Sequence, residues 1–255
     1  MKVHPLYEGS FSVDASKKFI PFDPQKDDPK DRKASIFIYV QPFLVETGSA
    51  LILFDAGLGQ NTPEGKLMLH ENIRKAGFDP DEVDMVLMSH LHADHSGGLV
   101  YEKDGELVPS FQEAKHVIQK DEWEFSLTGK SGSYPKEIFE ALKDNVELDL
   151  IEGSGEYTKH IRYELTGAHC PFHQVFWLEE NGEIVFFGGD VLPEPEQAIR
   201  KFAAKYDYDG RKAMELRAEY AKQANEENWL CLFYHGKSRA TGHIRIDANG
   251  GVSVV

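Results

Sequence analysis

Three histidines and an aspartate lie within six residues of this chain, at His90, His92, Asp94 and His95. They follow, after Ser89, the apolar run Val86–Met88, which is typical of a buried strand. Neutral imidazole is the commonest metal ligand in proteins, and carboxylate suits harder cations. The cluster therefore predicts a metal site at a strand end and favours a metal-assisted hydrolase over the alternative, a polar loop with histidines at a helix start.

The spacing of these residues indicates how they would share metal ions. Residues i and i+2 of an extended segment point the same way, so His90 and His92 can converge on one ion. A helix would serve less well, because i and i+2 do not face each other on a helix. Asp94 keeps the same direction if the chain stays extended, whereas a turn beside Gly97–Gly98 would aim Asp94 and His95 together at a second ion.

The cluster resembles the His-x-His-x-Asp-His signature of the metallo-β-lactamase superfamily, and other segments extend the resemblance. Leu51–Gly59 is similar to the superfamily's strand-Asp-x-Gly element, and Thr166–His169 to its later Gly-His segment. Phe186–Asp190 is similar to its Gly-Asp segment, and Phe233–Gly236 to its last ligand strand. The resemblance implies an α+β fold, a four-layer αββα sandwich with the metal site at one edge of the two sheets, formed as a single domain over residues 1–255.

The resemblance also implies the ligands of two divalent ions, Zn first, with Mn, Fe or Co as alternatives. Seven residues are expected to hold them: His90, His92, Asp94, His95, His169, Asp190 and His235. His169 would complete the first site, and Asp190 would bridge the two ions through its two oxygens. His235 would complete the second site, with His243 as the fallback for that position.

Two further residues are expected to lie behind the ligands. Asp55 would accept a hydrogen bond from a ligand histidine and fix its tautomer; the alternative is a turn aspartate before Gly57. His173 matches a family histidine that is not a ligand, although Phe172 stands where relatives carry Gly. Cys170 is expected to be a buried thiol and not a ligand. Histidines without motif context are expected to be solvated or structural: His4, His70, His116 and His160.

Two ions a few Å apart would lower the pKa of a bound water and make hydroxide available at neutral pH. They would also polarise the scissile carbonyl and stabilise the developing oxyanion. Asp94 is the expected catalytic residue, because its carboxylate can orient the nucleophile and pass a proton to the leaving group. The sequence is thus expected to encode a hydrolase of ester-like bonds.

Within the superfamily, the chain most resembles the lactonase-like branch, which includes acyl-homoserine lactonases. Its length and Asp190, where β-lactamase relatives carry cysteine, favour this branch. Those lactonases place a Tyr shortly after the bridging Asp, but Val191–Pro195 contains none. Tyr206, Tyr208 and Tyr234 are the candidates to replace it.

Two alternative activities remain open. Thioester hydrolysis of the glyoxalase II kind is one, although the chain lacks the helical substrate-binding domain that those relatives carry after the core. A mono-iron persulfide dioxygenase is the other, since two histidines and a carboxylate are available as its ligands. The presence of a second set, Asp94, His95 and His235, favours two metals.

Composition limits the partners. The 255 residues are 41% hydrophobic, enough for a substantial core. The net charge of −15 argues against nucleic acid, because binding to phosphates needs clustered Lys and Arg. No apolar run approaches a membrane span, Met1–Glu8 lacks a signal-peptide core, and Cys170 and Cys231 make no disulfide framework. We expect a cytoplasmic enzyme with a small-molecule substrate and no nucleic-acid or membrane partner; aromatic residues within 202–208 would line its pocket or a homodimer contact.

Hydrophobic periodicity predicts mixed strands and helices. Strands are predicted over residues 35–46, 50–55, 85–88, 114–119, 175–178, 184–187 and 229–234. Helices are predicted from 69 to a stop at Gly77, over 135–143 and over 210–224. Turns are predicted at Thr47–Gly48, Glu180–Gly182 and Asn249–Gly250, and a charged loop over 22–34.

Overall fold

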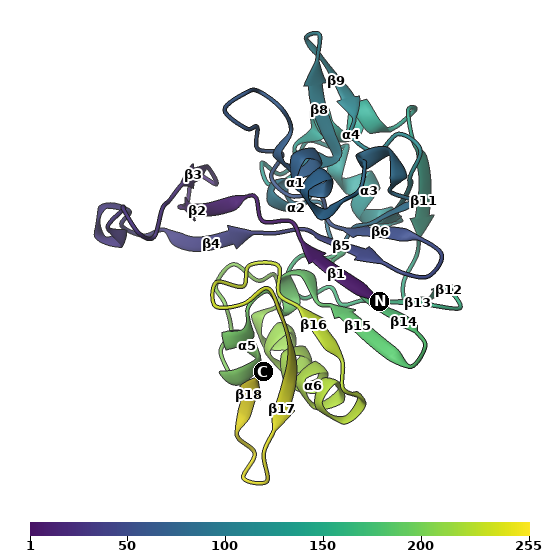
Figure 1. The fold of residues 1–255 in the computed structure, drawn as a ribbon. Coiled ribbons are helices and arrows are strands. Elements are labelled where there is room, and N and C mark those ends of the chain that lie inside the picture. Colours follow the sequence, from purple (N-terminus) through teal and green to yellow (C-terminus); the bar gives the residue numbers. More distant parts are fainter.

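The two-sided burial of the central strands determines the layering. In strand β6 (Leu51–Phe54) every residue is buried, with Leu51 and Leu53 in one hydrophobic cluster and Ile52 and Phe54 in another. Successive side chains of a strand point to opposite faces, so such a strand must lie between two packed layers. The protein is described by a computed structural model over residues 1–255, and Figure 1 shows two large sheets packed face to face with helices outside them.

The first sheet has six strands, in the order β1 (Lys2–Pro5), β5 (Phe43–Glu46), β6, β7 (Met85–Leu87), β10 (Lys115–Gln119) and β11 (Glu147–Ile151). Three helices cover its outer face: α1 (Met68–Ala76), α3 (Lys120–Ser126) and α4 (Lys136–Leu142). Leu69, Trp123 and Phe139, one from each helix, pack into the same cluster as Leu53. This sheet therefore buries its outer face against helices (Figure 1).

The second sheet has seven strands, in the order β12 (Gly155–Thr158), β13 (Ile161–Leu165), β14 (Gln174–Glu180), β15 (Glu183–Phe187), β16 (Leu230–Leu232), β17 (Thr241–Ile246) and β18 (Val252–Val254). Its outer face packs on α6 (Gly210–Glu227), with the short α5 (Pro195–Ile199) beside it. In β15, Phe186 faces this helix, while Phe187 faces Phe54 of the first sheet at a ring distance of 5.2 Å. The expected αββα sandwich is confirmed.

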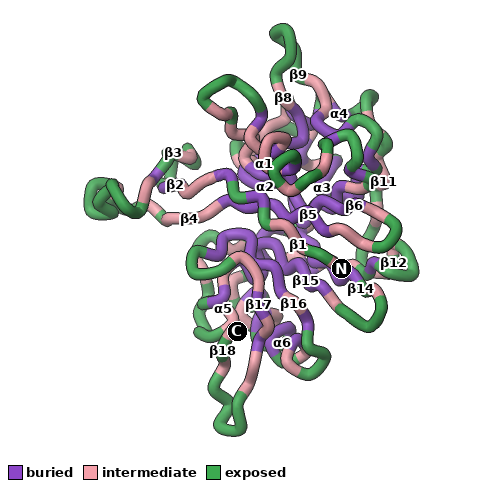
Figure 2. Tube along the Cα trace, in the orientation of Figure 1, coloured by how far each residue is buried: buried purple, intermediate pink, exposed green.

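A three-stranded arm, formed by an early part of the chain, projects from one side of the sandwich (Figure 1). It consists of β2 (Gly9–Val13), β3 (Phe19–Pro21) and β4 (Ile36–Val40), and β8 (Val100–Lys103) with β9 (Glu106–Pro109) forms a separate hairpin. The short helices are η1 (Pro29–Asp31), η2 (Pro80–Glu82), α2 (Ala93–Ser96), η3 (Gly97–Leu99) and η4 (Gly189–Val191). Figure 2 shows the buried residues gathered in the facing strands of the two sheets, and exposed residues at the tip of the arm.

The predicted strand over 35–46 is wrong, since it is two strands, β4 and β5, in different sheets. The chain breaks at Gln41–Pro42, where proline has no N–H for a sheet ladder and the buried Gln41 side chain donates to Phe233 O and Gly236 O at 2.8 and 3.0 Å. The helix stop at Gly77 (φ 100°) and the hairpin turn around Asn181 are confirmed.

The other predicted elements are confirmed with shifts of a few residues. The last predicted strand is shorter than 229–234 and ends at Leu232, so that His235 follows on a loop. Helix α3, the arm strands β2 and β3, and the β8–β9 hairpin were not predicted. None of the helices combines the length and the apolar character that a membrane span requires.

Candidate active site

The metal-motif loop changes conformation halfway along. His90 and His92 lie on the irregular segment after β7, where His92 has an extended backbone, whereas Asp94 and His95 lie on the single-turn helix α2. Of the two conformations that the sequence leaves open, the structure therefore has the turn. The two glycines after it allow close packing, because a Cβ on Gly98 would lie 2.1 Å from the carbonyl oxygen of Ala56.

His90, His92 and His169 come together as one group of candidate ligands. His92 Nδ1 lies 3.1 Å from His90 Nε2 and 3.2 Å from His169 Nε2. All three candidate ligand atoms lie within 4.8 Å of one another. His169 reaches them from the loop that follows β13, where Gly167 has a positive φ of 55°. Three imidazoles at this spacing can hold one divalent ion.

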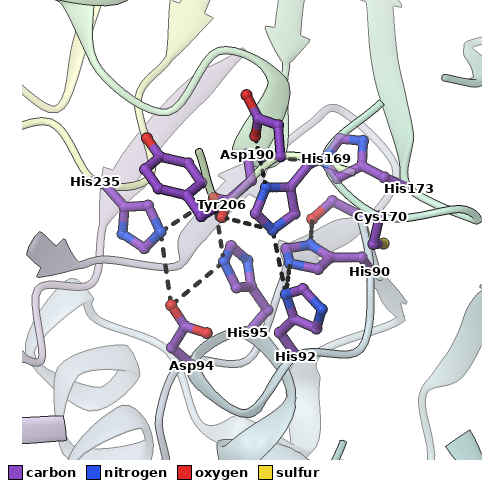
Figure 3. A network of polar contacts seen from close by, with 12 residues as sticks. His90, His92, Asp94, His95, His169, Cys170, His173, Asp190, Tyr206 and His235 are labelled. Atoms are coloured by element: carbon purple, nitrogen blue, oxygen red, sulfur yellow. Dashed lines mark hydrogen bonds and ion pairs between the residues drawn. The ribbon is translucent and has the colours of Figure 1, made fainter. Parts of the chain in front are cut away.

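Asp94, His95 and His235 form a second group. Asp94 Oδ2 lies 3.7 Å from His95 Nε2 and 3.6 Å from His235 Nε2, and the three ligand atoms again lie within 4.8 Å of one another. Figure 3 shows this group beside the first, with Asp190 between them.

Asp190 faces both groups through different oxygens. Its Oδ1 lies 3.3 Å from His95 Nε2 and 3.1 Å from His235 Nε2, while its Oδ2 lies 3.3 Å from His169 Nε2. A Cβ on the preceding Gly189 would lie 2.7 Å from His173 Nε2, so glycine is required for this close approach. The carboxylate thus occupies the place of a bridge between two ions.

The donor set fits two divalent ions. His95 Nε2 and Asp190 Oδ1 are buried and face each other at 3.3 Å, but neither makes a hydrogen bond. Such atoms are costly unless an ion or another group satisfies them. Mixed imidazole and carboxylate ligands suit Zn, Mn, Fe or Co. We therefore retain the seven residues as the predicted ligands.

Asp55 supports one histidine of each group. It is fully buried at a positive φ of 54°, and its Oδ2 accepts from His95 Nδ1 at 2.6 Å and from the Ser89 hydroxyl at 2.7 Å. Ser89 Oγ in turn lies 3.0 Å from His90 Nδ1. Since these contacts occupy the Nδ1 atoms, the Nε2 atoms of both rings remain free to face an ion.

The remaining supports differ from ring to ring. His235 Nδ1 donates to the carbonyl oxygen of Tyr39 at 2.6 Å. His173 is fully buried and lies behind Asp190, whose backbone N–H donates to His173 Nε2 at 3.0 Å. His173 therefore holds the Asp190 backbone, as a residue behind the ligands would. His169 Nδ1 contacts Asp207 Oδ1 at 3.1 Å, a partner that the sequence did not reveal.

Burial and neighbouring charges shift the pKa values of the candidate ligands. Burial, followed by neighbouring histidines, holds the pKa of His90 and His92 well below the usual value, so both are neutral. Burial alone would raise the pKa of Asp190, but His235 and the other nearby rings hold it well below its usual value. Burial acts to lower the pKa of His95, yet the nearby carboxylates raise it well above its usual value, so ion binding there displaces a proton.

Glu122, also missed from the sequence, links two ligand loops. It is buried, and its Oε1 accepts from Leu91 N at 3.1 Å, from the Tyr134 hydroxyl at 3.0 Å and from Cys170 Sγ at 3.4 Å. Burial, partly offset by these donors, raises its pKa to about 7. Cys170 is thus the expected buried thiol. His243, the fallback ligand, instead contacts the Trp229 carbonyl oxygen from β17.

A pocket of about 340 Å³ opens onto the two groups. The arm supplies an apolar wall to it: Val13, Phe19, Ile36 and Ile38. Tyr206 also lines the pocket, with its ring centroid 6.1 Å from that of His169. Of the three tyrosines considered from the sequence, Tyr208 is absent from the pocket lining, and Tyr234 is fully buried with its hydroxyl on Asp94 O.

A family model, that of the metallo-beta-lactamase superfamily, matches residues 37–235. The chain belongs to this superfamily. The match spans the arm strand β4, the motif loop and the loop that carries His235. The first sequence resemblance is therefore confirmed, and membership of the superfamily implies that the chain binds divalent metal ions.

Sequence relatives of this superfamily member include N-acyl homoserine lactonases. One from Bacillus thuringiensis is 26% identical over 156 residues, which cover 54% of this chain and 57% of the relative. AttM from Agrobacterium fabrum is 28% identical over 115 residues, 42% of this chain and 40% of the relative. The chain thus spans about half the length of the curated relatives it matches.

Solved structures share the fold along nearly the whole chain. A probable metal-dependent hydrolase from Staphylococcus aureus aligns with a TM-score of 0.77 and 21% identity, over 99% of this chain and 94% of that one. AidC, a dizinc quorum-quenching lactonase, aligns with a TM-score of 0.72 and 21% identity, over 98% and 92%. At these identities the structures show a common fold, and together with the superfamily match they identify a hydrolytic enzyme.

Proposed function

We propose that this enzyme is a dinuclear hydrolase that opens lactones, with Zn as the expected metal. The observation that carries the proposal is the position of Asp190, whose two oxygens face two separate ligand groups from 3.1 to 3.3 Å. The sequence relatives named as lactonases support the choice of substrate.

Bound divalent ions would act as Lewis acids toward the scissile carbonyl and would lower the pKa of a bound water. Asp94 lines the pocket, and its Oδ2 faces His95 and His235. Its other oxygen is then available to orient the attacking water and to carry its proton to the leaving alkoxide. In a lactone that alkoxide stays attached to the product, so a proton relay at this side of the pocket completes ring opening.

Tyr206 is the candidate to contact the substrate carbonyl. Burial and the charge of Asp190 raise its pKa to about 12, so at neutral pH its hydroxyl is protonated and can donate a hydrogen bond. The sequence offers no Tyr directly after Asp190, but the loop before α6 brings one back to the pocket. A donor aimed at the developing oxyanion stabilises the transition state more than the substrate.

The apolar wall of the arm fits an acyl chain. Phe19, Ile36 and Ile38 line the pocket across from the polar ligand groups, and its volume lies in the range of small-molecule sites. The negative net charge and this pocket together support a small-molecule substrate over a nucleic acid.

The two alternatives predict different chemistry. A thioester hydrolase would use the same two ligand groups, whereas a mono-iron dioxygenase would need only two histidines and one carboxylate. The second group, Asp94, His95 and His235, has no use in a mono-iron centre, which favours hydrolysis.

The proposal is tested by turnover of a matched panel. N-Hexanoyl homoserine lactone, the thioester S-lactoylglutathione and glutathione persulfide with oxygen are each offered to the Zn-loaded enzyme and to its His92→Ala variant. We expect lactone opening by the parent and loss of both metal and turnover in the variant. Undiminished metal content and turnover in His92→Ala, or persulfide oxidation without lactone opening, would overturn it.

A further inference from the structure

One loop delivers two different residues to the site. Residues 200–209, between α5 and α6, place Tyr206 in the pocket and the next residue, Asp207, on His169. Asp207 has a fully buried side chain, whereas Tyr206 is 46% exposed. The substrate-facing residue and the support of a predicted ligand are therefore neighbours in sequence.

Backbone contacts fasten the end of this loop to the His169 segment. The Tyr208 N–H donates to the carbonyl oxygen of His169 at 2.9 Å, and the Asp209 N–H donates to that of Ala168 at 2.8 Å. With the Asp207 contact at 3.1 Å, three hydrogen bonds join the loop to two consecutive residues. A displacement of His169 would therefore displace the loop end.

Arg217 on α6 fixes the other side of Asp207. It is buried, and its Nη2 lies 3.0 Å from Asp207 Oδ2. Its Nη1 donates to the carbonyl oxygen of Phe202 at 3.1 Å, and its Nε to that of Val191, the residue after Asp190, at 2.6 Å. One guanidinium thus joins the loop, the bridging-carboxylate segment and the His169 support.

Apolar packing holds the loop only weakly. Three of its aromatic residues are at least partly exposed, with Phe202 at 38%, Tyr206 at 46% and Tyr208 at 72%. The order of such a segment depends on the polar contacts that remain, here those of Asp207 and Arg217.

We propose that Asp207 and Arg217 are positioning residues that couple ion binding at His169 to the order of loop 200–209. An ion fixes the His169 ring, the ring fixes Asp207, and Asp207 with Arg217 fixes the loop and hence Tyr206. By linkage, an ordered loop must also strengthen ion binding. This inference rests on the proposed metal centre, and it adds that the substrate pocket is completed only when the centre is loaded.

The order of the loop can be measured by limited proteolysis, because trypsin cleaves after Arg200, Lys201 and Lys205. We expect Zn to slow cleavage at these sites at least tenfold relative to chelated enzyme, as followed by the masses of the fragments. Cleavage in the mostly exposed segment 24–34 serves as the internal reference for trypsin activity.

The test variant is Asp207→Asn, which keeps the shape of the side chain. We expect about 10- to 100-fold weaker Zn binding by chelator competition, the usual loss for a partner behind a ligand, and loss of the Zn-dependent protection. Arg211→Met is the control variant. Arg211 lies on α6, as Arg217 does, but it pairs with Glu215 at the surface. The double variant Asp207→Asn with Arg217→Met avoids a buried unpaired guanidinium and is expected to behave like Asp207→Asn.

The outcomes separate this inference from the proposed function. If the parent binds Zn and opens lactones but both Asp207 variants keep its Zn affinity and its protection, the coupling is wrong and the hydrolase stands. If the parent binds no Zn, both are wrong. Weakened Zn binding with unchanged protection would also overturn the coupling, because Asp207 would then act on His169 alone.

Discussion

Replacing Asp55 by asparagine is expected to remove the ion held by Asp94, His95 and His235 first. Asp55 accepts three hydrogen bonds in a fully buried position, from Ser89 N at 2.7 Å, Ser89 Oγ at 2.7 Å and His95 Nδ1 at 2.6 Å. An ionised carboxylate can accept all of them, whereas an amide has one oxygen and two N–H donors.

Either orientation of the introduced amide is unfavourable. If the amide oxygen stays on Ser89 N, the NH₂ group faces His95 Nδ1, which must then accept, and the ring proton moves to Nε2. Nε2 is the atom that faces Asp190 at 3.3 Å, so its lone pair is lost as a ligand. If the amide turns round, its NH₂ group meets the Ser89 N–H and leaves two buried donors unpaired.

Loss of a hydrogen-bond partner behind a metal ligand typically weakens metal binding by about 10- to 100-fold, or about 1.4–2.8 kcal/mol. The assay is competition with a chelator, followed by elemental analysis of the retained metal. Asp84→Asn is the matched control, because Asp84 also accepts a backbone N–H, that of Leu51, but lies away from the site. If Asp55→Asn keeps two ions per chain with parental affinity, the tautomer argument is wrong.

Three further predictions concern the pocket, the pH dependence and the packing. Tyr206→Phe is expected to lower kcat by about 10²- to 10³-fold while metal content stays constant, as measured by steady-state kinetics; an unchanged kcat would exclude Tyr206 as the carbonyl donor. Burial raises the pKa of Glu8 from 4.5 to about 8, and a carboxyl that binds its proton more tightly when folded loses its contribution to stability as pH rises from about 4.5 to 8. Denaturant unfolding should therefore show Glu8→Gln gaining stability relative to the parent between pH 5 and pH 9, by up to about 4 kcal/mol, and a constant difference across that range would contradict the shift. Gly98→Ala places a Cβ 2.1 Å from Ala56 O, and an unfolding free energy lowered by about 1–3 kcal/mol is expected; an unchanged midpoint would mean that the loop moves freely.

The motif loop could be interpreted from the sequence because its information is local. Val86–Met88 predicts a strand, and the i, i+2 spacing of His90 and His92 predicts their convergence. The turn that redirects Asp94 and His95 depends on close packing against Ala56, which is remote in sequence, so spacing alone leaves both conformations open.

The hydrogen-bond partners behind the predicted ligands could not be found from sequence spacing. Asp207 is 38 residues from His169, and Glu122 is 48 residues from Cys170, with no motif around either acid. The role of Asp55 could be predicted only because a known family motif surrounds this residue. The break at Pro42 was missed for a related reason: both flanking segments are apolar, and periodicity does not reveal that they belong to different sheets.

The central claim, that Asp190 joins two ion sites, is tested most directly by counting divalent metal ions per chain by elemental analysis in freshly purified parent and in the His235→Ala variant. We predict close to two ions in the parent and about one in the variant, since His90, His92 and His169 are untouched. One ion per chain in the parent, with no change in the variant, would contradict the dinuclear site.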